Sequence, residues 1–316
     1  MRDWIKVAIL LLACFTSIAW FIGQGLNADN YQFFLTLRLP KVLAIVLAAM
    51  AISASSLVFQ TITNNRILTP SILGFDSLYL LVQVIIVVIF GMASVLVIEA
   101  IPNFLLSTAV MIGFSLTLFH FYFKRGSSNI FTLLLIGVVC GSLFNSLTGF
   151  LTMLVDPNEF AVIQRAMFAS FNNINAELVY WSAIPLILCF AYLFFSARKL
   201  DVLWLGQDNA TSLGINTQRL TKQMMIVITV MVAIATALVG PVLFFGLITV
   251  SLTRELFKRF EHSFLIVTSS LLAVLLLVSG QWFVEKVLTF QTTISVIINL
   301  VGGSYFMWLL LRNKIN

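Results

Sequence analysis

Residues 208–223 read DNATSLGINTQRLTKQ, and these polar and charged residues interrupt a chain that is otherwise almost continuously apolar. The 316 residues are 60% hydrophobic and 9% charged, with 29 Phe and a mean hydropathy of +1.06. Such a composition excludes a water-soluble domain and is typical of a protein with many membrane-spanning helices. The polar segment must therefore lie outside the bilayer, between two spans.

Ten apolar segments are long enough to be spanning helices, because a helix that crosses ~30 Å of hydrocarbon needs about 20 apolar residues. No soluble domain or low-complexity tail interrupts them, so we expect a single all-α polytopic membrane domain over residues 1–316. The polar loop 198–222 is part of this domain. The expected spans are residues 4–23, 41–62, 77–92, 102–123, 130–155, 178–197, 222–240, 242–257, 264–284 and 291–311.

The first segment has an alternative interpretation as a lipoprotein signal, because a basic start and an apolar run lead to LLAC, which ends at Cys14. The apolar run continues well past Cys14, whereas a cleaved signal has a shorter hydrophobic region. We therefore predict a retained first helix. Cys14, Cys140 and Cys189 all fall inside expected helices without metal-ligand spacing, which favours packing roles.

Lys and Arg residues are distributed unequally between the two sides of the ten-helix arrangement. Four of the 18 fall on one side, namely Arg38, Lys41, Arg165 and Lys286, and the other 14 fall on the side of the N-terminus. Cytoplasmic loops of membrane proteins carry the excess of positive charge. The distribution thus predicts that both termini and the loop 198–222 are cytoplasmic.

The sequence contains no motif for a catalytic centre or a nucleotide site. It has no GxxxxGK[ST] loop, no HExxH and no paired carboxylates on a helix. An acidic residue inside a span would favour an ion-coupled carrier, because a charge in the bilayer is costly and is retained for use. The pattern instead indicates a conduit whose energy comes from another chain, and not an enzyme. Acidic residues at expected helix ends or in loops are Asp76, Glu99, Asp156, Glu159, Glu177, Asp201, Glu255 and Glu261.

The polar segment itself has the signals of two short helices. Asp208 or Asn209 can cap the first helix, Gly214 can end it, and the sequence NTQRL begins another. Two short surface helices of this kind could sit in a groove of a partner protein. The alternative is an ordinary solvated loop.

Four motifs resemble, in order and spacing, those of the permeases of iron-chelate and cobalamin ABC importers. DNATSLGINTQRL is similar to the coupling loop of that family, and RLPK at 38–41 is similar to its RLPR. QTITNNRILTPSILGF at 60–75 and GPVLFFGLI at 240–248 are similar to two further motifs, so the resemblance covers residues 38–312. Within the 60–75 motif the matching residues are Gln60, Asn65, Leu73 and Gly74.

The resemblance implies the fold and partners of a type II importer. Two permeases of ten helices each, identical or paralogous, join two cytoplasmic ATPases, and an extracytoplasmic binding protein delivers a ferric siderophore. ATP hydrolysis belongs to the ATPases, so this resemblance implies no cofactor and no nucleic acid for the permease, which lies in the bacterial cell (inner) membrane. The residues implied to meet the ATPase are Thr211, Leu213, Gly214, Ile215, Asn216 and Arg219.

The chain departs from the family pattern at 249–251, 261–263 and 291–295, which indicates a divergent member. Its NNRILTPSILGFDSLYLL segment at 64–81 resembles the branch that serves petrobactin-type and anguibactin-type catecholate siderophores. Two alternatives from other classes are an ion-coupled carrier and a receptor-like membrane subunit that senses a chelate. Dependence of transport on ATP would distinguish the permease of an ABC importer from the ion-coupled carrier and from the receptor-like subunit.

The expected fifth helix carries small and polar residues on one face. In LLIGVVCGSLFNSLTGF at 134–150, Gly137, Gly141, Asn145 and Gly149 recur every four residues. Small residues at this spacing indicate close helix packing. The resemblance implies instead that this helix lines the translocation path, and both interpretations stay open.

Arg38 and Lys41 oppose the positive-inside bias and therefore need an explanation. The resemblance implies that positive charges at RLPR pair with glutamates of the binding protein, with Lys286 a substitute for an arginine that is Val284 here. The alternative is that Arg38 and Lys41 anchor a helix end at the headgroups. For the lone His262 we expect no iron ligation, because a metal needs several converging donors.

Two segments 181 residues apart resemble one another. RLPKVLAIVLAAMAISASSLVFQ begins at Arg38, and RLTKQMMIVITVMVAIATALVGP begins at Arg219. In the ten-helix arrangement these helices run in opposite directions. Such a relationship is what an inverted-repeat transporter predicts.

Overall fold

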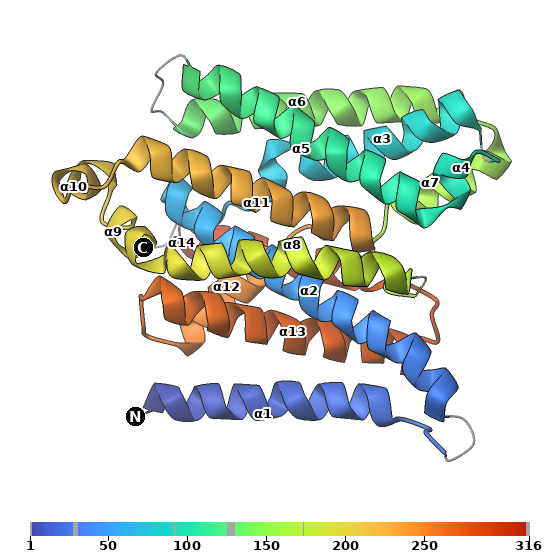
Figure 1. Cartoon of the computed structure of the whole chain (residues 1–316), viewed down its shortest axis with the longest axis horizontal. Helices are drawn as coiled ribbons and strands as arrows, with labels where there is room; N and C mark the ends of the chain where they lie inside the picture. The colour runs from blue at the N-terminus through green and yellow to red at the C-terminus, as the bar shows by residue number, and fades with distance from the viewer. Residues whose placement is uncertain (1, 28–30, 92, 125–129, 173, 314–316) are drawn as a thin grey trace.

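The computed structural model describes residues 2–27, 31–91, 93–124, 130–172 and 174–313, and all regular secondary structure in these ranges is helical. Fourteen α-helices and one 3₁₀ helix follow one another along the chain (Figure 1). In order they are α1 (Arg2–Gly23), α2 (Tyr31–Thr63), η1 (Pro70–Leu73), α3 (Phe75–Phe90), α4 (Val95–Ile98), α5 (Ala100–Lys124), α6 (Ile130–Thr152), α7 (Pro157–Ala166), α8 (Ala176–Phe195), α9 (Ala197–Leu203), α10 (Gln207–Ser212), α11 (Thr217–Val239), α12 (Phe245–Leu256), α13 (His262–Lys286) and α14 (Ile294–Asn313).

Each of the ten segments expected from hydropathy coincides with a helix. Within the described residues, seven of these helices are long and apolar enough to cross a membrane, namely α1, α2, α5, α6, α8, α11 and α13. Helices α3 and α14 are apolar but shorter, and the 12 residues of α12 span only ~18 Å at 1.5 Å per residue. The all-helical architecture is therefore confirmed, while the count of ten spans is approximate.

Two of the short helices begin after backbone that is not α-helical and that packs inside the protein. Helix α3 follows η1, and α12 follows the segment 240–244. Gly240 in this segment approaches another backbone so closely that a Cβ atom would lie 2.8 Å from the Cα of Ala169. Irregular backbone at membrane depth is tolerated where protein buries it. The expected spans ended at residues 62 and 240 and resumed at residues 77 and 242, so the sequence predicted both breaks, but it did not predict that their backbone packs inside the protein.

Helix α2 is the centre of the bundle and packs against α13, α11, α12 and α8 (Figure 1). It begins ten residues before the expected span, and Pro40 lies inside it. Ala44, Ala48 and Ala51 are fully or almost fully buried. Small residues let neighbouring helix backbones approach closely, which matters because lipid is as apolar as a leucine side chain and gives no hydrophobic drive for helix association.

The two ends of the bundle differ. Helices α9 and α10 protrude at one end, where α1 also begins, whereas α4 and α7 lie at the other (Figure 1). We refer to these as the α10 end and the α7 end. Helix α2 runs from the α7 end to the α10 end, and α11 runs back beside it (Figure 1). The opposite directions of these two helices are those expected for the inverted repeat.

Candidate functional site

The polar segment forms a small helical surface at the α10 end. Helix α10 begins after Gly206, whose φ of +102° suits glycine, and ends before Gly214, whose φ is +84°. The predicted cap at Asp208 or Asn209 is wrong, because both residues lie inside the helix. Asn216 caps the next helix, α11, and its side chain accepts a hydrogen bond of 2.9 Å from the backbone N–H of Arg219.

Most residues predicted to meet an ATPase are exposed on this surface. Leu213 is a large apolar side chain with 64% of its surface exposed, and, chain neighbours aside, none of the described residues has an atom within 4 Å of a Cβ built on Gly214. Thr211, Asn216 and Arg219 are also exposed, whereas Ile215 is half-buried. Ala210 is fully buried and fixes α10 against its neighbours. The result is a tight turn between Gly206 and Gly214 with an exposed leucine at its tip.

A buried hydrogen-bonded chain holds this surface to the bundle. Asp201 on α9 accepts a bond of 2.7 Å from the backbone N–H of His262, and its Oδ1 lies 2.6 Å from Nδ1 of the same ring. On the other side of the ring, Nε2 lies 2.7 Å from Oγ1 of Thr61 on α2. His262 is only 2% exposed. Three helices, α9, α13 and α2, thus meet at one imidazole.

Opposing effects act on the pKa of Asp201. Its partial burial alone would raise the pKa, because the charged form loses water. The hydrogen bonds from the His262 ring and backbone, together with the charge of the ring, outweigh burial and hold the pKa below its ordinary value. Asp201 is therefore an anion that His262 stabilises.

Trp204 adds an aromatic contact beside this chain. The guanidinium carbons of Arg254 and Arg66 lie 4.8 and 5.6 Å from the centre of the Trp204 ring, and His262 meets the ring edge-on at 6.3 Å. A guanidinium over an indole face is an attractive cation–π contact. These contacts connect the end of α9 to α12 and to the segment after α2. Sequence reasoning missed this cluster, because its members are far apart in the chain.

The glycine face of α6 divides into two parts. Gly137 and Gly141 are buried against η1, since a Cβ on Gly137 would lie 2.8 Å from the Cα of Leu73. A Cβ on Gly74 would likewise lie 2.9 Å from the Cα of Gly141. Asn145 and Gly149 are exposed, and no atom of the described residues outside its own helix backbone lies within 4 Å of a Cβ built on Gly149. The first two positions therefore serve close packing, and the last two are free to face a path or a partner.

The residues predicted to dock a binding protein lie towards the α7 end, and two of them have partners within the chain. Arg38 donates hydrogen bonds of 2.7 and 2.5 Å to the carbonyl oxygens of Ile22 and Gln24. Lys41 forms a half-buried ion pair of 2.8 Å with Glu285. Lys286 is exposed. Glu285 has no sequence signal that separates it from other helix-end acids, and sequence reasoning missed it.

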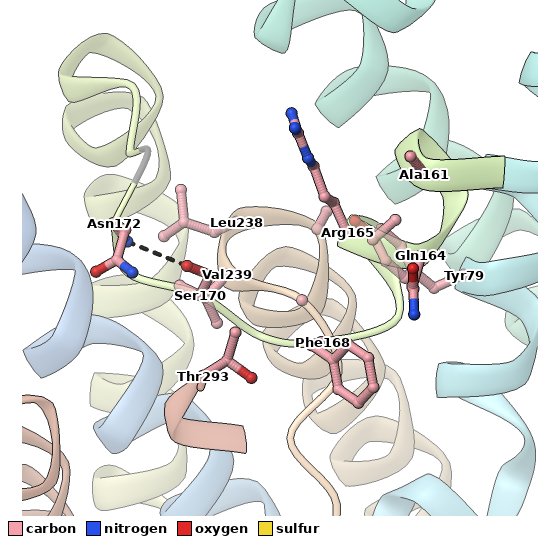
Figure 2. A pocket seen from close by; sticks show the side chains of 13 residues that line it. Tyr79, Ala161, Gln164, Arg165, Phe168, Ser170, Asn172, Leu238, Val239 and Thr293 are labelled. Carbon is pink, nitrogen blue, oxygen red and sulfur yellow. Dashed lines mark hydrogen bonds between the residues drawn. The ribbon is translucent and has the colours of Figure 1, made fainter. Parts of the chain in front are cut away.

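A cavity of about 610 Å³ also opens at the α7 end. Its lining combines α3, α7, the segment after α7, the end of α11 and the residue before α14, as Figure 2 shows for Tyr79, Gln164, Asn172, Leu238 and Thr293. The segment after α7 is fixed by a hydrogen bond of 2.8 Å from the backbone N–H of Ser170 to the carbonyl of Val239. Within the described residues, no group of three His, Cys, Asp or Glu side chains could hold a metal ion.

A model of the FecCD transport family matches residues 5–312. The chain belongs to this family. It is 49% identical to the petrobactin import system permease protein YclO of Bacillus subtilis (strain 168), over 99% of both chains. It is also 31% identical to the petrobactin import system permease protein FatC of Bacillus anthracis, over 99% of this chain and 90% of that protein.

The fold is also that of a solved transporter structure. An inward-facing conformation of a putative metal-chelate type ABC transporter superposes with a TM-score of 0.82 and 22% identity, covering 96% of this chain and 97% of that one. Membership of the FecCD family confirms the resemblance inferred from the four motifs. The chain is an integral permease, a transport component and not an enzyme, and it is a multi-pass protein of the bacterial cell (inner) membrane.

Proposed function

We propose that this FecCD chain is the permease subunit of an ATP-driven importer for a ferric siderophore of the petrobactin type. The observation that carries the proposal is its 49% identity, over 99% of both chains, to a petrobactin import permease. The chain itself offers no cluster of metal-ligating side chains among the described residues. A siderophore already satisfies its iron, so the permease needs to pass a bulky chelate and not to hold the metal.

The surface of α10 is the proposed contact with the ATPase. Leu213 at its tip is exposed and apolar, while the polar residues around it remain solvated. An exposed leucine on a rigid turn can enter an apolar pocket of a partner at little cost in conformational freedom. This assignment places the α10 end in the cytoplasm, together with both termini, in agreement with the excess of Lys and Arg there.

The α7 end is the proposed contact with an extracytoplasmic binding protein. Lys286 is exposed. Arg38 and Lys41 lie in the same region, and their charged groups are bonded to partners within the chain. Exposed complementary charges guide association and set orientation more than they add affinity. A second permease, identical or paralogous, completes the importer, and the exposed positions Asn145 and Gly149 of α6 belong to the proposed path.

Transport in proteoliposomes tests the proposed function. The permease is reconstituted with the ATPase, binding protein and any second permease encoded beside it. We expect uptake of ⁵⁵Fe-petrobactin that requires hydrolysable ATP inside and is unaffected by ionophores that collapse proton and sodium gradients. A ferric hydroxamate serves as the control cargo. Uptake driven by an ion gradient without ATP would exclude the importer, and equal uptake of the hydroxamate would exclude the proposed selectivity.

A further inference from the structure

Asp76 lies in the first turn of α3, directly after the η1 helix and Gly74. Its place at a helix end agrees with the sequence, but its surroundings do not resemble a loop. Only 8% of the residue surface is exposed, and its Oδ2 atom has no hydrogen-bond partner among the described residues. A buried carboxylate oxygen without a partner is costly, so a native protein compensates it.

The space beside Asp76 is a small cavity of about 20 Å³. About 10–15 Å³ is enough for one water-sized occupant, so the cavity has room for one small particle without a full hydration shell. Asp76 supplies its only carboxyl group, and no Lys, Arg or His of the described residues lines it. The side chains with hydroxyl groups around it are Ser55, Ser56, Thr69, Ser71 and Thr236.

The hydroxyl groups in this cavity can act as oxygen ligands. Ser55, for example, donates its hydrogen to the carbonyl of Ile52 at 3.1 Å, which leaves the oxygen lone pairs free. Oxygen ligands suit hard cations, and no sulfur or imidazole group lines the cavity. Interrupted membrane helices recur as cation sites because they bring polar backbone and side chains together away from lipid.

Charge and size select the occupant. One carboxylate is neutralised by one monovalent cation, whereas a divalent ion would leave a net positive charge in a medium of low polarity. Magnesium also keeps several waters and demands octahedral geometry, for which the cavity has no room. We propose that Asp76, with the hydroxyl groups of α2, η1 and α11 around it, binds a dehydrated monovalent cation of sodium or potassium size.

The cation would fix the position of η1. Ser55 and Ser56 belong to α2, Thr236 to α11, and Thr69 and Ser71 flank the start of η1. An ion held between them opposes separation of these elements. Since η1 contacts α6 through Leu73 and Gly74, the same ion supports the glycine face of α6. The occupant is therefore a resident part of the permease, and the inference stands independently of which chelate is transported.

Thermal unfolding of the purified full-length importer complex tests the site. Sodium chloride or potassium chloride is titrated against N-methyl-D-glucamine chloride at constant pH and total ionic strength. We expect at least one of the two metal ions to raise the melting temperature by about 3 °C or more in a saturable manner. Asp76→Asn, which keeps the shape and removes the charge, should lose this response. Asp156→Asn, at an exposed carboxylate, should retain it.

Other outcomes overturn the proposal. Equal melting temperatures in sodium, potassium and N-methyl-D-glucamine would show that no cation is bound, and a midpoint that changes with pH alone would show a protonated Asp76 instead. Thr236→Val provides a second test if Asp76→Asn does not fold. This change removes one oxygen ligand at nearly constant volume, so the cation concentration for half-maximal response should increase severalfold. An unchanged midpoint would contradict the site.

Discussion

Asp201 and His262 are 61 residues apart in the chain, yet Oδ1 of the one and Nδ1 of the other are separated by 2.6 Å. This contact joins α9, which leads into the α10 surface, to the first turn of α13. The ring also meets Thr61 on α2, so a displacement of α10 acts on two helices of the central bundle through one side chain. The contact therefore provides a direct mechanical connection between the proposed ATPase surface and the bundle.

Asp201→Asn is expected to make the permease less sensitive to acid. Because the folded-state pKa of Asp201 is lower than its ordinary value of 3.8, its stabilising effect is complete above that value and is lost as pH falls through the folded-state pKa. The wild type should lose melting temperature more steeply than Asp201→Asn below about pH 4. Melting curves across this range provide the measurement, with the exposed Asp208→Asn as control. Parallel curves for wild type and Asp201→Asn would contradict the role of the pair.

Gly214→Trp is expected to abolish chelate-stimulated ATP hydrolysis and uptake while the permease still inserts. The indole would occupy the open space beside Leu213 and prevent its entry into the ATPase. Because φ at Gly214 is +84°, any side chain also strains the backbone. Gly214→Asn separates the steric effect of the indole from the backbone strain. Asparagine tolerates the left-handed region better than other residues with a side chain, and it adds much less volume than an indole. Normal stimulated hydrolysis in Gly214→Trp would exclude this surface as the coupling contact.

Gly141→Phe and Asn145→Phe should fail in different ways, although both lie on one face of α6. The Cβ of a side chain at position 141 would already lie 3.2 Å from the Cα of Gly74, so overpacking should cost about 1–3 kcal/mol or more and reduce the yield of folded protein. Asn145 is exposed, so its variant should fold, assemble with the ATPase and block uptake. Uptake at the wild-type rate in Asn145→Phe would remove this position from the path.

The Lys41–Glu285 pair allows an internal role of Lys41 to be tested separately from a role in docking. Lys41→Glu breaks a half-buried ion pair and should destabilise the permease by about 1–2 kcal/mol. The charge exchange Lys41→Glu with Glu285→Lys should restore stability. Any loss of transport that remains in the exchanged variant then reports on docking, because the internal ion pair has been restored. Full recovery of both stability and binding-protein affinity would leave Lys41 with the internal role alone.

The helices of this fold could be predicted because apolar runs of about 20 residues have few alternatives in a membrane protein. Their exact ends could not. Helix α2 begins at Tyr31, ten residues before the expected span and with Pro40 inside it, and α12 begins at Phe245 although its span was expected from residue 242. In both cases tertiary packing decides where the helix begins, and packing is not encoded in local hydropathy.

The coupling surface could also be predicted from the sequence, because its polarity and its glycines distinguish it from the apolar spans. The residues that hold this surface to the bundle could not be predicted. Asp201 belongs to a loop by sequence, and a lone histidine at 262 suggests at most a metal ligand, so neither residue indicates a partner 61 positions away. Lys41 and Glu285 are 244 positions apart, and Asp76 gives no local sign of burial.

The glycine contact between η1 and α6 limits how this permease can change shape. Cβ atoms on Gly137 and Gly141 would lie 2.8 and 3.2 Å from the Cα atoms of Leu73 and Gly74, so almost no free space separates the two backbones. Helices α3 and α6, which also pack against each other, are therefore expected to move together in any change of shape. The hinges of such a motion have to lie outside this unit, and Gly91 at the end of α3, with a φ of +74°, is suitably placed for one of them.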